Sequence, residues 1–127
     1  MAAGARLALI TIPPLRADQA TTQLATLTQV MHEVADEHPG QVFVLDSDGA
    51  WGPEFTQDVN GDKVPERKPD GVHVCPSGAA MYAVWLLGEL QQRFESFVAA
   101  PPAEWATEQW VDDPRYTQPA GICARLP

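Results

Sequence analysis

The run Leu7-Ala8-Leu9-Ile10-Thr11-Ile12 is mostly apolar and partly β-branched, and Pro13-Pro14 ends it. Such a run favours a strand buried on both faces over an alternating, half-exposed one. Between Asp18 and Glu37 a helical period follows, with apolar residues spaced 4, 3, 4 and 3 apart: Ala20, Leu24, Leu27, Met31 and Val34. After the stop signal His38-Pro39-Gly40, a second strand is predicted at Val42-Phe43-Val44-Leu45. A strand, a helix and a strand in succession are typical of a parallel crossover unit, which predicts an α/β fold.

The remainder of the chain divides into a long loop, a helix and a tail. No period survives from Ala50 to Val74, after the acidic turn Asp46-Ser47-Asp48-Gly49, and long loops in compact domains are often functional. We expect Ser77 to cap a second helix that runs to about Val98. Its apolar face would be formed by Ala83, Leu87, Leu90, Phe94 and Phe97. Pro101-Pro102 ends this helix, and a short helical stretch is expected over Glu104–Val111.

Composition limits the function classes. The chain has 127 residues, which favours a single domain. Eight Lys and Arg against seventeen Asp and Glu give a net charge of −9, and the basic residues are scattered, so nucleic acid is not an expected partner. The longest apolar run, Met81 to Leu87, is too short to span a membrane, and Met1–Arg6 lacks the hydrophobic stretch of a secretory signal.

The densest group of chemically capable residues lies between the long loop and the second helix, at Asp70-Gly71-Val72-His73-Val74-Cys75. Histidine is the natural general base near neutral pH, and it works best when a carboxylate holds its second N–H. Asp70, three residues before His73, can fold back to do this. A plain interpretation stays open, in which Asp70-Gly71 forms a turn and His73 is a loop residue bonded to backbone.

The longer context Pro69-Asp70-Gly71-Val72-His73-Val74-Cys75-Pro76-Ser77-Gly78-Ala79, followed by a helix that holds Trp85, resembles the last sequence block of the SGNH hydrolases, or GDSL-type esterases. In that family an Asp-x-x-His pair supplies the acid and base of a Ser-His-Asp triad. The resemblance therefore implies that His73 is the general base and Asp70 the residue that orients it. It also implies a partial three-layer α/β/α, flavodoxin-like fold, in which residues 1–127 form the last strands and helices of one SGNH-like domain.

The tail extends the resemblance. Asp113-Pro114-Arg115-Tyr116 and Pro119-Ala120-Gly121-Ile122-Cys123 are similar to the ending of SGNH domains on bacterial cell surfaces, some of them fused to membrane acyltransferases. Cys75 and Cys123 are the only cysteines, so one intramolecular disulfide is possible, and two buried free thiols are the alternative. A disulfide would favour an extracytoplasmic or cell-surface setting within a larger exported protein; without such export the expected setting is cytoplasmic.

The sequence lacks the family's motifs for the serine nucleophile and the oxyanion donors. No Gly-Asp-Ser motif is present, and the serines, Ser47, Ser77 and Ser96, have ordinary explanations as turn, cap and helix residues. Asn60, the single asparagine, lies outside the family's oxyanion motif. We therefore expect a serine esterase or acyl hydrolase domain without its N-terminal, nucleophile-bearing half, acting on an ester or carbohydrate O-acyl substrate, and inactive as an isolated chain. The alternative is a non-catalytic remnant or interaction domain that pairs with a separate half. The expected partners are this missing half or a fused membrane acyltransferase domain.

The sequence signals for a calcium or zinc site are weak. Asp58-Val59-Asn60-Gly61-Asp62 begins like a calcium loop, but Lys63 stands where glycine is needed and Pro69 where a glutamate should close the site. His32 and His38 are six residues apart and face different sides of a helix, which disfavours zinc. We expect no cofactor and no metal.

Overall fold

The computed structural model describes residues 4–16, 22–105, 123, 126 and 127. It divides into two compact units, residues 1–54 and residues 55–127, which are considered separately. The prediction of one SGNH-like domain stays a prediction.

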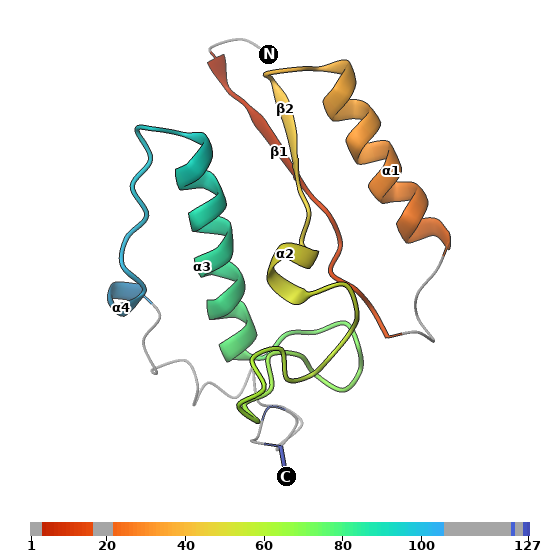
Figure 1. Cartoon of the computed structure of the whole chain (residues 1–127), viewed down its shortest axis with the longest axis vertical. Helices are drawn as coiled ribbons and strands as arrows, with labels where there is room; N and C mark the ends of the chain where they lie inside the picture. Colours follow the sequence, from red (N-terminus) through yellow and green to blue (C-terminus); the bar gives the residue numbers. More distant parts are fainter. Residues whose placement is uncertain (1–3, 17–21, 106–122, 124–125) are drawn as a thin grey trace. The chain divides into compact units, whose positions relative to one another are not determined.

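In the first unit, strand β1 (Leu7–Ile10), helix α1 (Thr22–Glu37) and strand β2 (Val42–Leu45) form the expected crossover. The strands pair in parallel, with Leu7 opposite Val42 and Ile10 opposite Leu45, and α1 contacts β2 (Figure 1). Val42 and Leu45 are buried, as expected for a parallel strand covered by a helix. The predicted α/β class is confirmed, as a small two-stranded parallel sheet with several helices.

The predicted first strand was two residues too long. Thr11 still donates its N–H to the carbonyl of Leu45, but its side chain turns to accept a hydrogen bond from the N–H of Ser47. Pro13 has no N–H with which to extend the ladder. The second strand is confirmed at its predicted bounds, while the acidic turn after it becomes a short helix, α2 (Asp48–Trp51). Residues 18–21 of the first predicted helix lie outside the described residues.

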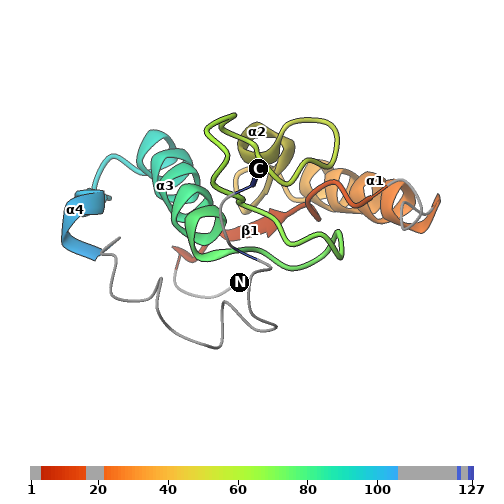
Figure 2. The ribbon, with the colours of Figure 1, turned by 90° about the horizontal axis from the view of Figure 1, so that it is seen from below.

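The second unit begins with the irregular segment that leads to helix α3 (Pro76–Arg93) and the short helix α4 (Pro102–Trp105) (Figures 1 and 2). The predicted cap at Ser77 was wrong. Cys75 is the N-cap residue with an extended backbone, and Pro76 takes the first helical position, where a missing N–H costs nothing. The Ser77 hydroxyl instead donates to the carbonyl of Pro65, at 2.6 Å.

Helix α3 also ends earlier than predicted. Phe94 has an extended backbone, so Phe97 lies beyond the helix although both continue its apolar spacing. Apolar spacing indicates which face is buried and not where the last turn ends. Of the helical stretch expected over Glu104–Val111, Glu104 and Trp105 lie in α4, and residues 106–111 lie outside the described residues.

Candidate functional site

The segment that holds His73 is a small hairpin built on the N-terminus of α3. Its two arms meet at an antiparallel bridge between Arg67 and Val74. The N–H of Lys68 donates to the carbonyl of His73 at 2.9 Å, and the N–H of Cys75 donates to the carbonyl of Glu66 at 2.8 Å. Four residues, 69–72, are therefore left to turn the chain between the paired positions Lys68 and His73.

The base of the hairpin is tightly packed. Pro65, Glu66, Arg67 and Cys75 are almost fully buried, and a Cβ added to Gly78 would overlap the backbone of Glu66. Only glycine lets the first turn of α3 approach this arm so closely. The Gly78 that the sequence places three residues after Cys75 thus fixes the hairpin against the helix.

The tip of the hairpin is a turn that its residue types favour. The N–H of Gly71 donates to the carbonyl of Lys68 at 3.1 Å, which closes a β-turn with Pro69 in its second position. Gly71 has φ of 83°, in the left-handed region that glycine adopts without strain. Pro-Asp-Gly is therefore the sequence signal for this turn, and Asp70 lies at its outer corner.

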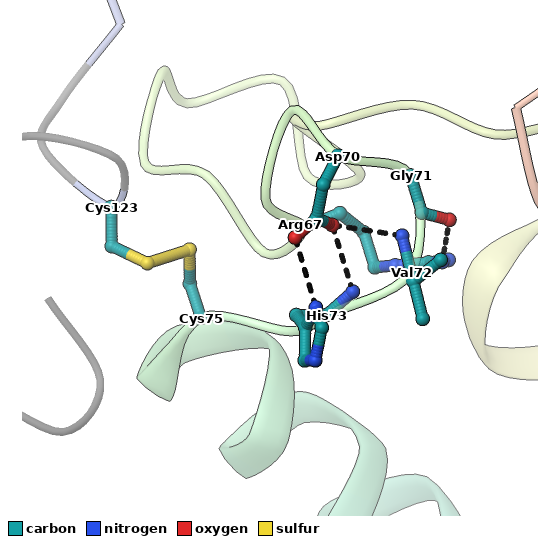
Figure 3. Close-up of polar contacts among 7 residues, drawn as sticks. All are labelled: Arg67, Asp70, Gly71, Val72, His73, Cys75 and Cys123. Carbon is teal, nitrogen blue, oxygen red and sulfur yellow. Dashed lines mark hydrogen bonds and ion pairs between the residues drawn. A yellow bond between two sulfur atoms is a disulfide. The ribbon is translucent and has the colours of Figure 1, made fainter. Parts of the chain in front are cut away.

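The carboxylate of Asp70 accepts three hydrogen bonds. Its Oδ1 accepts from the backbone N–H groups of Val72 and His73, at 2.9 and 3.0 Å, and its Oδ2 lies 2.9 Å from Nδ1 of His73 (Figure 3). Burial acts to raise the pKa of Asp70. The two backbone donors and the His73 ring outweigh it and lower the pKa to about 2. The carboxylate is thus ionised and oriented at neutral pH.

His73 presents its other ring nitrogen outward. The side chain is 71% exposed, and Nε2 has no hydrogen-bond partner in the described part of the chain. When Nδ1 carries the proton that it donates to Asp70, Nε2 is left with its lone pair and can accept a proton. The predicted contact between Asp70 and His73 is therefore present, in the orientation that a general base needs. Their catalytic roles stay a prediction.

Arg67 lies beneath this turn and was missed by the sequence analysis. Its side chain is about 1% exposed, and its Nη2 donates to the carbonyl of Gly71 at 3.0 Å (Figure 3). Its guanidinium carbon lies 5.2 Å from the ring centre of Phe55. Burial lowers the pKa of Arg67, and the charge of Asp70 opposes that effect. The sequence Glu66-Arg67-Lys68 resembles an exposed charged run, but Glu66 and Arg67 are both about 1% exposed in the arm that pairs with Val74.

Cys75 and Cys123 form the disulfide that the sequence allowed, with their Cα atoms 5.7 Å apart. The alternative of two free thiols is therefore wrong. The bond is attached two residues after His73, at the N-cap of α3 (Figure 3). Residues 113–116 and 119–122, whose pattern resembles the ending of cell-surface SGNH domains, lie outside the described residues.

The described serines have structural roles, although Ser77 and Ser96 do not take the helix positions expected of them. Ser47 is buried in the first unit, where its hydroxyl accepts from that of Thr11 at 3.3 Å, and Ser77 is engaged with Pro65. Ser96 lies beyond α3 rather than near its end, and it is exposed. Among the described serines, none has a hydrogen bond to His73. The side-chain amide of Asn60 donates to Glu66 at 3.0 Å, which is a structural role.

The calcium-like loop is closed by its own backbone. The two carboxylate oxygens of Asp58 accept from the N–H groups of Asp62 and Lys63, and Asp62 accepts from the N–H of Val64. Over residues 4–16, 22–105 and the described end of the tail, no group of three or more His, Cys, Asp or Glu side chains could hold a metal ion.

The first unit contains a second histidine–carboxylate pair, which the sequence analysis also missed. Nε2 of His32, on α1, lies 3.1 Å from Oδ1 of Asp46, directly after β2. The signal was a carboxylate at the end of a strand beside a helix that covers it. A cavity of about 250 Å³ lies at the same end of the strands, and its lining includes Thr11, Asp46, Ser47 and Asp48.

No helix within the described ranges is long and apolar enough to cross a membrane. No curated protein and no solved structure matches the chain. A family model, described as protein of unknown function (DUF459), matches residues 1–89, a range that contains the crossover unit, the hairpin with Asp70 and His73, and most of α3. Because this match covers well over half of the 127 residues, the chain belongs to the DUF459 family.

Proposed function

We propose that this chain contributes the base and the orienting acid of an SGNH-type serine ester hydrolase. The observation that supports the proposal is the 2.9 Å contact between Asp70 Oδ2 and Nδ1 of a ring whose Nε2 is exposed. A Ser-His-Asp triad uses the two ring nitrogens in this way, with the carboxylate on Nδ1 and the nucleophile on Nε2. The match between the sequence Asp70-Gly71-Val72-His73 and the last SGNH block agrees with that arrangement.

In the proposed reaction, Nε2 of His73 removes the proton of a serine hydroxyl as the oxygen attacks the acyl carbonyl of the ester. Asp70 remains ionised and stabilises the imidazolium that forms. The imidazolium then gives its proton to the leaving alcohol, which departs as the acyl-enzyme forms, and hydrolysis of that ester by water regenerates the serine. An ester or a carbohydrate O-acyl group is the proposed substrate class.

The nucleophile must come from another segment, because the 127 residues contain no Gly-Asp-Ser motif. That segment lies either elsewhere in the same polypeptide or in a partner chain, and a fused membrane acyltransferase domain is a further proposed partner. The disulfide is compatible with an oxidising, extracytoplasmic setting, which we propose for the assembled enzyme.

The test is an ester-hydrolysis assay on two proteins. One is the chain of residues 1–127, and the other is the product of its gene together with the neighbouring coding sequence that supplies a Gly-Asp-Ser segment. With p-nitrophenyl acetate and an O-acetylated sugar, the larger protein should hydrolyse ester and the chain alone should stay near background. A fluorophosphonate probe should label the serine of the Gly-Asp-Ser segment.

Two outcomes would contradict this proposal. If the His73→Gln variant of the larger protein hydrolysed ester as fast as wild type, His73 would not be the general base. Hydrolysis by residues 1–127 alone, abolished by His73→Ala, would place a nucleophile inside this chain.

A second function, a non-catalytic interaction domain, has one observation in its favour. The described sheet has two strands, and Leu7 in β1 and Ile12 after it are 45% and 43% exposed, although parallel sheets are usually covered on both faces. Size-exclusion chromatography tests whether this surface is an interface. A chain that pairs with a separate half should oligomerise or aggregate alone and become monodisperse with its partner, whereas a self-sufficient domain should elute as a monomer. The ester-hydrolysis assay on the assembled protein then distinguishes a non-catalytic interaction half from a catalytic one.

A further inference from the structure

We infer that Arg67 is the positioning residue of the proposed acid–base pair, holding the turn that carries Asp70 from its buried side. The inference rests on the proposed function, since a positioning role matters to catalysis only if His73 acts as a base. The structural part of the inference, that Arg67 sets the geometry of the pair, can be tested without any hydrolysis.

The turn has a buried side and an exposed side. Asp70 and His73 are exposed, whereas Gly71 between them is buried, and its carbonyl accepts from Nη2 of Arg67 at 3.0 Å. The N–H of the same glycine closes the turn onto Lys68. Arg67 therefore fixes the peptide unit that joins Gly71 to Val72, and the N–H of that same unit, on Val72, donates to the Asp70 carboxylate.

Burial of the Arg67 guanidinium is energetically costly unless its charge is compensated. A buried charge is retained only where it is paired or hydrogen-bonded, and an arginine about 1% exposed is unusual. The guanidinium of Arg67 lies over the ring of Phe55 at cation–π distance, and it interacts electrostatically with Asp70. Its positive charge thus favours the ionised carboxylate that His73 requires.

Without a contact from its buried side, the turn would leave the Asp70 carboxylate free to bind water instead of His73. Asp70 lies at the tip of a loop of four residues and is about half exposed, so the carboxylate would exchange readily with water if the loop relaxed. The other charged groups along this hairpin are Glu66, which accepts from Val59 and Asn60, and Lys68, whose backbone closes the turn. Arg67 is a buried charged side chain that donates to the tip itself.

The test compares Arg67→Met, which keeps the length of the stem, with Arg67→Lys, which also keeps the charge. The readout is the ¹⁵N NMR signature of the His73 ring in the neutral state, which reports the fraction of the Nδ1–H tautomer. A carbon-detected titration of the Asp70 carboxyl is the second readout. Wild type should show mainly Nδ1–H, Arg67→Lys less, and Arg67→Met the tautomer mixture of an unstructured peptide spanning the turn. The pKa of Asp70 should rise in the same order.

The backbone amide spectrum identifies variants that have kept the fold, and Arg67→Lys decides the question if Arg67→Met does not fold. A folded variant with the wild-type tautomer fraction and carboxyl titration would overturn the inference. In the complete hydrolase, Arg67→Met should lower kcat about 10²-fold with KM little changed, as expected for a misplaced base.

The failures of the two proposals are distinguishable. Altered NMR signatures with a wild-type protein that hydrolyses no ester would refute the proposed function and leave the positioning of the pair intact. Hydrolysis that depends on His73 but is unchanged in Arg67→Met, with unchanged NMR signatures, would refute the positioning role alone.

Discussion

The two histidine–carboxylate pairs of this chain differ in which ring nitrogen the carboxylate holds. Asp46 lies against Nε2 of His32, the nitrogen farther from the backbone, and leaves Nδ1. Asp70 lies against Nδ1 of His73 and leaves Nε2, which can reach a substrate or a nucleophile. Both pairs are partly exposed and have similar lengths, 3.1 and 2.9 Å. Distance alone would therefore not separate a candidate base from a surface contact.

The pairs also differ in how the carboxylate is held. Asp70 accepts two backbone N–H groups from its own turn in addition to the ring. In the described part of the chain, the Asp46 carboxylate accepts from His32 alone. A carboxylate fixed by its own backbone is already oriented before the histidine is charged, which is what preorganised electrostatic catalysis requires. Matched substitutions in the two pairs test whether these differences matter for catalysis.

The largest expected effect is that of His73→Ala against His32→Ala in the complete hydrolase. Loss of the general base should lower kcat by at least about 10⁴-fold, because a triad without its histidine retains only binding and oxyanion stabilisation. His32→Ala should leave hydrolysis of p-nitrophenyl acetate unchanged. Equal losses in the two variants would show that the orientation of the ring does not distinguish the pairs.

Asp70→Asn should lower kcat by up to about 10⁴-fold, since an amide can favour the wrong tautomer of His73. Asp46→Asn is its matched control and should retain wild-type kcat and KM. The measurement is steady-state hydrolysis over a range of ester concentrations. A wild-type kcat in Asp70→Asn would assign the contact with His73 to the plain turn interpretation.

Removal of the disulfide should destabilise the second unit. The bond links residues 48 apart, and the chain-entropy model gives roughly 4 kcal/mol for a loop of that length, as an upper figure. We expect Cys75→Ser and Cys123→Ser each to lower the free energy of unfolding by about 2–4 kcal/mol in denaturant titrations. Amide hydrogen exchange should accelerate around His73 more than around His32, and equal acceleration at both pairs would contradict this prediction.

The smallest expected effect is on acid stability. The pKa of Asp70 is lowered to about 2 in the folded chain, below its ordinary value of 3.8. Its contribution to stability is therefore present above about pH 4 and is lost as the pH falls toward 2. Urea unfolding of Asp70→Asn over this range should depend less on pH than that of wild type. An identical pH dependence would mean that the pKa of Asp70 is the same in the folded and unfolded chain.

The sequence predicted those features that depend on local pattern. The second strand, the first helix up to Glu37 and the parallel crossover follow from apolar periodicity, and the turn at Asp70 follows from Pro-Asp-Gly. The contact between Asp70 and His73 is short in sequence and was anticipated for that reason. The disulfide was allowed because two cysteines permit one intramolecular pairing.

What the sequence did not predict depends on contacts made across the fold. Arg67 is buried because its arm of the hairpin pairs with Val74 and packs on α3, and a charged triplet gives no sign of this. Ser77 is a reasonable cap by type, but the carbonyl of Pro65 lies within its reach and competes for its hydroxyl. The contact between His32 and Asp46 joins residues fourteen apart, on a helix and after a strand, so only the packing of α1 on β2 creates it.

The disulfide has a topological consequence. Cys75 and Cys123 close a covalent ring of polypeptide that includes α3 and α4. A protease that cuts the chain between these helices, at residues 94–101, would open the ring without releasing either fragment. The nicked protein would migrate as one species on a non-reducing gel and as two after reduction. The hairpin with His73 would thus stay tethered to the C-terminal part of a cleaved chain.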